Sequence, residues 1–200
     1  MKSKRNNIVL ENNKVIKTFI RGDKAHELMI YKMLAQANVR HAQVLSYNDH
    51  QIVLSYISGE TLLDIFMRCE QNHDSFVSYL DLWFDYMMDF YKATKTYRHG
   101  DVHLSNFIYQ DGQVIGLDFE QAIEQELIKD IVDLICYVLF YEPKLTSYKI
   151  DTVVSWFAHL PIKKQWDKQT WMDELQEALH RLNLRRKTSY MVDWSFLFKE

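Results

Sequence analysis

The segment HGDVHLSNF, residues 99–107, brings two histidines, an aspartate and an asparagine together within nine positions. His99, Asp101 and His103 alternate, so their side chains point to one side if the segment is extended. Zinc binding is one hypothesis, but the remaining histidines are scattered singly, without the H-x-x-x-H or cysteine partners of a zinc motif. A polar loop between two apolar segments is the plainer alternative. The residues that follow favour a third interpretation, a catalytic loop.

A second aspartate follows in VIGLDFE, residues 114–120, at the end of an apolar strand. The preceding QDGQ predicts the turn of a hairpin, and its strand pairing brings Asn106 close to Asp118. Amide and carboxylate oxygens suit a hard cation, and Mg²⁺ commonly uses one or two carboxylates together with substrate phosphates. Asp101 is predicted to face the same site without being a ligand, where a base for an attacking hydroxyl would stand.

The composition predicts one large domain or two small lobes. Of the 200 residues 48% are hydrophobic, which is enough apolar material for a buried core. The net charge of −3 gives no whole-chain field toward nucleic acid, so no nucleic-acid partner is indicated. No uninterrupted apolar run is long enough for a membrane span or a signal peptide, and Cys69 and Cys136 are expected to be free buried thiols. We therefore expect a cytoplasmic protein.

The first 58 residues predict a small sheet with one helix against it. Two short strands surround the polar turn ENNK within residues 8–20, a helix covers residues 24–38, and a hairpin covers residues 42–57. From Gly59 onward the pattern is mainly helical, with helices expected at 76–94, at 126–142 and between residue 149 and the end. The fold class is therefore α+β, with an N-terminal lobe at residues 1–58 and a helical lobe at residues 59–200.

HGDVHLSN followed by IGLDFE resembles the catalytic loop and metal-binding strand of the protein-kinase-like superfamily. The two motifs are similar to the H-G-D-x-H-x-x-N and D-F/W-E pattern of aminoglycoside and choline kinases. It is also similar to the small atypical kinases of the RIO type, the lipopolysaccharide-kinase type and the kinase of the KEOPS tRNA-modifying complex. The resemblance implies a bilobal kinase fold that uses ATP and Mg²⁺ to transfer the γ-phosphoryl group to a hydroxyl acceptor.

The resemblance also assigns roles. Asp101 corresponds to the catalytic base, and Asn106 and Asp118 to the metal ligands. Lys17, in the strand KVIKTFI, would hold the nucleotide phosphates, with Glu27 of the following helix as its partner. Lys14 is the competing lysine, but it lies at the turn, where a side chain faces water.

Further expectations concern the adenine-binding segment and the residues that support the catalytic loop. The backbone of Ser55, Tyr56 and Ile57 would receive adenine. His99 is expected to be structural, and no role is derived for His103. Asp130 and Asp133 share an otherwise apolar helix, so burying them requires partners. Asp133 is the one expected to bind the backbone of the turn at residues 99–101.

Two features depart from the kinase pattern. No glycine precedes Lys17, so a glycine-rich loop over the phosphates is missing. Asp130 follows Glu120 by only ten residues, which leaves no room for a long activation segment, and switching by its phosphorylation is therefore not expected.

The acceptor stays open. A small-molecule or glycan hydroxyl suits the HGDVHLSN motif and the missing activation segment, whereas a protein serine or threonine suits the small size of the chain. A nucleotide-binding pseudokinase scaffold is a third alternative. The segment HRLNLRRKTSY, residues 180–190, is basic and suits an anionic substrate or partner, although a solvated helix end is the plainer explanation.

Overall fold

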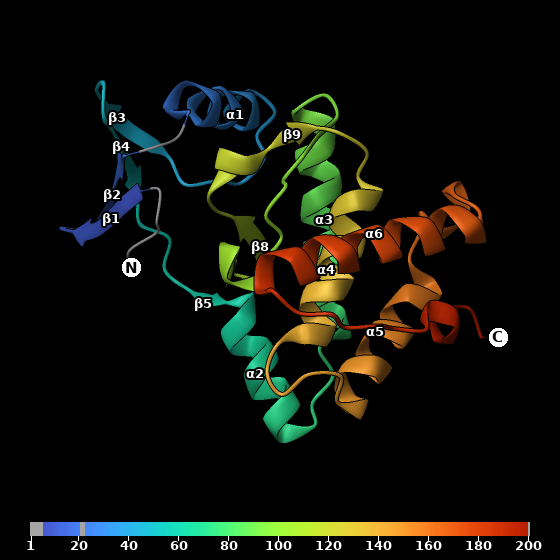
Figure 1. Ribbon diagram of the computed structural model, residues 1–200. Coiled ribbons are helices and arrows are strands. Elements are labelled where there is room, and N and C mark those ends of the chain that lie inside the picture. Colours follow the sequence, from blue (N-terminus) through green and yellow to red (C-terminus); the bar gives the residue numbers. More distant parts are fainter. Residues whose placement is uncertain (1–5, 21–22, 200) are drawn as a thin grey trace.

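The computed structural model describes residues 6–20 and 23–199. Its N-terminal part is a four-stranded antiparallel sheet in the order β1-β2-β4-β3, which lies at one end of the molecule with helix α1 beside it (Figure 1). These elements are β1 (Asn6–Glu11), β2 (Lys14–Phe19), α1 (Lys24–Gln36), β3 (Val44–Tyr47) and β4 (Gln51–Ser55).

Individual residues explain the β1–β2 turn, the start of α1 and the burial of Lys17. Asn12 and Asn13 connect β1 to β2 with φ angles of 47° and 62°, a left-handed pair that asparagine tolerates and that tight hairpins require. Asp23 caps α1, because its carboxylate accepts a hydrogen bond of 3.0 Å from the His26 amide. Lys17 lies opposite Ile52 in the β2–β4 pairing, so the central strands carry this lysine into the interior.

Two small strand pairings frame the segment that contains both sequence motifs. β6 (Tyr97–Arg98) pairs with β9 (Ile123–Glu124), so the two ends of the segment 99–122 lie next to each other. Inside this segment, β7 (Phe107–Gln110) and β8 (Gln113–Gly116) form the expected hairpin, and β5 (Glu60–Thr61) adds to its edge. The catalytic loop and the segment after β8 are therefore held together by backbone pairing.

The rest of the chain is helical. It comprises α2 (Leu62–Asn72), α3 (Val77–Ala93), α4 (Ile128–Phe140), α5 (Ser147–His159), α6 (Lys168–Arg186) and the short 3-10 helices η1 (Leu104–Asn106), η2 (Phe119–Gln121), η3 (Lys163–Gln165) and η4 (Trp194–Phe198). α4 is buried along almost its whole length, with only Lys129 partly accessible, and α5 and α6 pack against it (Figure 1). The mixed α+β architecture predicted from the sequence is confirmed.

Two further expectations concern the chain as a whole. Cys69 and Cys136 are buried free thiols, as predicted. Within the described ranges 6–20 and 23–199, none of the helices combines the length and apolar character that a membrane crossing requires.

Candidate active site

The catalytic loop is anchored by a buried carboxylate of α4. The amides of His99 and Gly100 donate to Asp130, at 2.6 Å and 3.1 Å from its two oxygens. Arg98 lies 3.0 Å from the same carboxylate. Burial raises the pKa of the Asp130 carboxyl above its usual range, and the positive charge of Arg98 offsets part of that effect.

This anchor corrects the prediction for Asp133. The hydrogen bonds to the turn at residues 99–101 come from Asp130, while Asp133 binds Arg98 at 3.0 Å and Arg181 of α6 at 2.8 Å. The two aspartates lie three residues apart on one side of α4 and share Arg98, but they stand at different heights along the helix axis. Asp130, in the first turn of α4, meets the loop, and Asp133 meets α6.

His99 occupies a structural position. Its ring is buried between Phe107 and Phe119, at centroid distances of 5.1 Å and 5.4 Å. Nε2 lies 3.0 Å from the Leu117 carbonyl oxygen, and Nδ1 accepts from the Asp101 amide at 3.4 Å. Burial lowers the pKa of this imidazole, so the neutral ring donates from Nε2 and joins the catalytic loop to the end of the hairpin.

Asp101 stands in a partly accessible position at the centre of the loop. Gln121 donates from Nε2 to its carboxylate at 3.2 Å, and the side-chain nitrogen Nδ2 of Asn106 donates to its backbone carbonyl at 3.0 Å. Gly100 has a φ of 81°, and a Cβ atom there would overlap the carbonyl oxygen of Gln121. Glycine is therefore needed both for the backbone conformation and for this close approach.

Asn106 and the segment of Asp118 lie side by side. The Leu117 amide donates to the Asn106 carbonyl at 2.8 Å, directly beyond the Phe107–Gly116 pair of the hairpin. Because the side-chain nitrogen of Asn106 is used on the loop, its side-chain oxygen is the atom left for a ligand. Asp118 takes a left-handed conformation (φ 57°, ψ 72°) and turns its carboxylate toward the N-terminal sheet.

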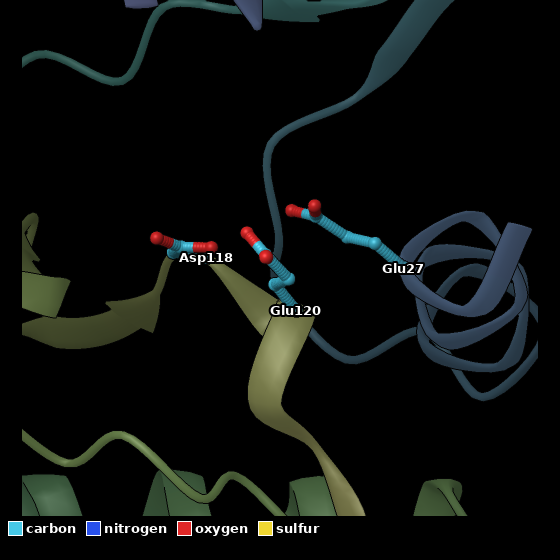
Figure 2. Close-up of side chains that lie close together, drawn as sticks. All are labelled: Glu27, Asp118 and Glu120. Carbon is cyan, nitrogen blue, oxygen red and sulfur yellow. The ribbon is translucent and has the colours of Figure 1, made fainter. Parts of the chain in front are cut away.

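Lys17 meets three carboxylates. Its Nζ lies 2.7 Å from Glu27, 2.6 Å from Asp118 and 3.6 Å from Glu120. The pairing of Lys17 with Glu27 is thus present, whereas Lys14 is exposed near the turn. Figure 2 shows these three acidic side chains close together. One carboxylate oxygen of each lies within 4.8 Å of the others.

Glu120 was not among the predicted site residues. The sequence feature that could have identified it is its place in DFE, two residues after Asp118. η2 turns this glutamate back toward the sheet. Asn6 donates to its carboxylate. The sequence does not say that this glutamate reaches the ammonium of a strand lysine, because that depends on how the two parts of the chain meet.

One ammonium faces three acidic groups, which leaves an excess of negative charge. Burial raises the pKa of Glu27 to about 7, although Lys17 pulls it down. Burial alone would lower the pKa of Lys17, but Glu27 and Asp118 outweigh that effect and raise it. The chemistry of this donor set, oxygen atoms with uncompensated charge, suits a hard divalent cation.

The segment expected to receive adenine follows β4. The Ser55 amide donates to the Gln43 carbonyl at 2.8 Å, and the Tyr56 amide donates to the Asn13 carbonyl at 3.2 Å. The Ile57 amide has no hydrogen-bond partner in the described part of the chain. If a nucleotide base is bound here by a backbone N–H, Ile57 is therefore the residue that offers one.

Three solved structures are similar to the chain. A choline/ethanolamine kinase family protein from Mesorhizobium loti has a TM-score of 0.49 and 13% identity, over 99% of this chain and 83% of that one. An ethanolamine kinase from Plasmodium vivax has a TM-score of 0.48 and 11% identity, over 97% and 80%. The amicoumacin kinase hAmiN, solved with AMP-PNP, Ca²⁺ and Ami, has a TM-score of 0.39 and 14% identity, over 94% and 90%.

Curated protein sequences include no match to this chain. A family model does match. The RIO domain covers residues 2–135, from the N-terminal sheet to the middle of α4, and so includes every residue of the site described above. Because this match spans more than half of the sequence, the chain belongs to the RIO domain family, which is protein-kinase-like.

Proposed function

We propose that this protein is an ATP-dependent phosphotransferase that uses a divalent cation, Mg²⁺, to move the γ-phosphoryl group to a hydroxyl acceptor. The observation that carries this proposal is the position of Lys17. It is paired with Glu27 and touches Asp118, which follows the hairpin whose first strand begins beside Asn106. Family membership supports the same conclusion.

Different residues of the site would bind the nucleotide and the cation. Lys17, held by Glu27, would bind the α- and β-phosphates of the nucleotide, and its contact with Asp118 would give way to them. Asn106 and Asp118 would hold the cation, with Glu120 close by. When bound, the cation neutralises charge on the phosphoryl oxygens.

Asp101 would orient the acceptor hydroxyl and accept its proton. Hydrogen bonds from the side chains of Gln121 and Asn106 fix this residue. Positioning rather than covalent chemistry would account for the rate. The adenine would lie at residues 55–57. In this proposal, residues 1–58 act as the nucleotide-covering lobe and residues 59–200 as the lobe that carries the catalytic loop.

A small-molecule or glycan hydroxyl is the acceptor that we place first. Between η2 and α4 the chain holds only β9 and a few further residues, which offers no platform for a peptide. A protein serine or threonine is the second candidate, because the family match is to the RIO domain, one of the minimal kinase types that suit such an acceptor.

Turnover and nucleotide binding test the proposal together. We expect Asp101→Asn to lower ATP-dependent phosphoryl transfer by roughly 10²- to 10⁴-fold, the usual effect of losing a general base. The variant should keep the rise in melting temperature that ATP produces only with Mg²⁺. Asp111→Asn, at the exposed turn of the same hairpin, is the matched control and should leave both unchanged.

Two results would contradict the assignment. Equal transfer rates in wild type and Asp101→Asn would remove Asp101 from its role. Nucleotide binding without any transfer in the wild type would favour the pseudokinase scaffold.

A further inference from the structure

The basic C-terminal end of α6 lies against α4 and is not a helix end projecting freely into solvent. Arg185 donates from Nη1 to the Tyr137 hydroxyl at 2.6 Å, and its guanidinium carbon lies 5.2 Å from the centroid of that ring. Arg186 donates from Nη1 to the Phe140 carbonyl at 2.6 Å. In Figure 1, α6 crosses α4 and its later, redder end lies on the side of α4 nearest β8.

The Tyr137 ring contacts both Arg185 and the catalytic-loop residue His103. The His103 ring packs edge-on against Tyr137 and Tyr141, at centroid distances of 5.2 Å and 5.0 Å. The Tyr141 hydroxyl accepts from the Leu104 amide at 2.9 Å, which fixes this layer to the loop. Asp101 is near enough to raise the pKa of Tyr137, on top of the larger effect of burial.

The two arginines also lack acidic partners. Arg181, one turn earlier on α6, pairs with Asp133 and Glu177. Within residues 6–20 and 23–199, neither Arg185 nor Arg186 lies within ion-pair distance of a carboxylate, although both are exposed. Each guanidinium has five N–H groups and uses one of them on a neutral oxygen, so most donors remain for a ligand.

The charge of this end is opposite to that at the nucleotide end. Around Lys17 three carboxylates favour a cation, whereas beside the later half of α4 two guanidinium groups favour an anion. Guanidinium forks match the oxygens of phosphate and carboxylate groups better than a point charge does. The RIO domain match ends at residue 135, so Tyr137 and both arginines are features of this chain beyond the matched domain.

We propose that the acceptor is a small hydroxyl compound that carries a phosphate or carboxylate group, held by Arg185 and Arg186 while its hydroxyl faces Asp101. This inference rests on the proposed phosphotransferase function and names its substrate class. The acceptor oxygen bonds to the γ-phosphorus, the bond from that phosphorus to the β–γ bridging oxygen breaks, and ADP leaves. The hydroxyl proton passes to the carboxylate of Asp101.

Binding is measured with sets of ligands that share a carbon skeleton and differ in whether they carry an anionic group. Glycerol, glycerate and glycerol 3-phosphate form one such set, and sorbitol, gluconate and sorbitol 6-phosphate form another. At a concentration ten times the dissociation constant, a bound anion should raise the melting temperature by about 3 °C. We expect this rise with the anionic members, with and without MgADP, and none with the neutral alcohols.

Variants connect the effect to the arginines. Arg185→Gln and Arg186→Gln should each weaken binding of the anionic compounds about tenfold to a hundredfold, which is the loss expected for charged hydrogen bonds. The KM for ATP should stay unchanged. Arg40→Gln, an exposed arginine on the loop between α1 and β3, is the matched control and should bind as the wild type does.

The outcomes separate the two proposals. If anionic and neutral compounds bind equally, or if both glutamine variants keep the preference for anions, the substrate class is wrong even when phosphoryl transfer occurs. Transfer to serine peptides flanked by glutamate, without transfer to small anions, would also overturn it. Failure of the Mg²⁺-dependent ATP effect would contradict the phosphotransferase itself, and the nucleotide-free binding series would still decide the anion preference.

Discussion

The backbone amide of His99 lies 2.6 Å from Oδ2 of Asp130, a residue that follows it by 31 positions. The carboxylate is fully buried and also accepts from the Gly100 amide and from Arg98. The conformation of the HGD turn therefore depends on α4, the central helix of the molecule. A change in this one carboxylate should reach Asp101 through the backbone.

The first prediction compares the two aspartates of α4. Asp130→Ala should lower the free energy of unfolding by about 3–5 kcal/mol, because it leaves buried donors without an acceptor. Asp133→Ala should cost less, about 1–2 kcal/mol, since Arg98 keeps Asp130 and Arg181 keeps Glu177. Urea denaturation measures both values. An equal or larger loss of stability in Asp133→Ala would contradict the assignment of Asp130 as the residue that anchors the loop.

The second prediction concerns two glycines with similar backbone angles. The backbone angles at Gly100 (φ 81°) and Gly112 (φ 77°) both favour glycine. Of these two, only Gly100 lies against another backbone segment, at the Gln121 carbonyl. Gly112→Ala should cost about 1 kcal/mol from the left-handed conformation alone. Gly100→Ala should cost more, because it adds a steric overlap, and it should also slow phosphoryl transfer. Equal losses of stability and unchanged turnover in both variants would contradict this account.

Much of the site follows from order and spacing in the sequence. The resemblance to kinases pairs Lys17 of a strand with Glu27 of the following helix, and the structure contains this pair. Likewise, the QDGQ turn between two apolar runs predicts the β7–β8 hairpin, and the hairpin fixes where residues 106 and 117 meet. These relations depend on local turns and on short strand pairings, which the amino-acid pattern specifies directly.

Other relations depend on how whole elements are rotated. Asp130 and Asp133 lie three residues apart on a helix that is buried almost all round, so its apolar pattern does not show which aspartate faces the loop. The environment of Arg185 and Arg186 also cannot be told from the sequence. A basic helix end reads the same whether its side chains face water or contact another helix, as Arg185 contacts Tyr137 here. Glu120 reaches Lys17 only because η2 follows the left-handed Asp118.

The third prediction tests the role of Lys17 against a neighbouring lysine. Lys17→Met should weaken ATP binding about tenfold or more, the amount expected when a charged contact to phosphate is lost. Lys14→Met, in the same strand but exposed, should bind ATP as the wild type does. Titration of each protein with ATP in the presence of Mg²⁺ gives the dissociation constants. Equal affinities in the two variants would mean that Lys17 does not contact the nucleotide.

The fourth prediction concerns pH and the buried imidazole of His99. Burial lowers the pKa of this ring from its usual 6.5, so below that pH the unfolded chain binds a proton that the folded protein does not. The contribution of His99 to stability should therefore fall as the pH drops below about 6.5, whereas Glu27, whose pKa is raised to about 7, contributes in the opposite direction in wild type and variants alike. His99→Gln keeps an N–H for the Leu117 carbonyl but does not titrate, so between about pH 7.5 and pH 5.5 it should lose less free energy of unfolding than the wild type does. Some slope should remain, because burial lowers the pKa of His103 as well. His180→Gln, at an exposed position, should keep the wild-type slope, and an identical slope in His99→Gln would mean that His99 is not the titrating group.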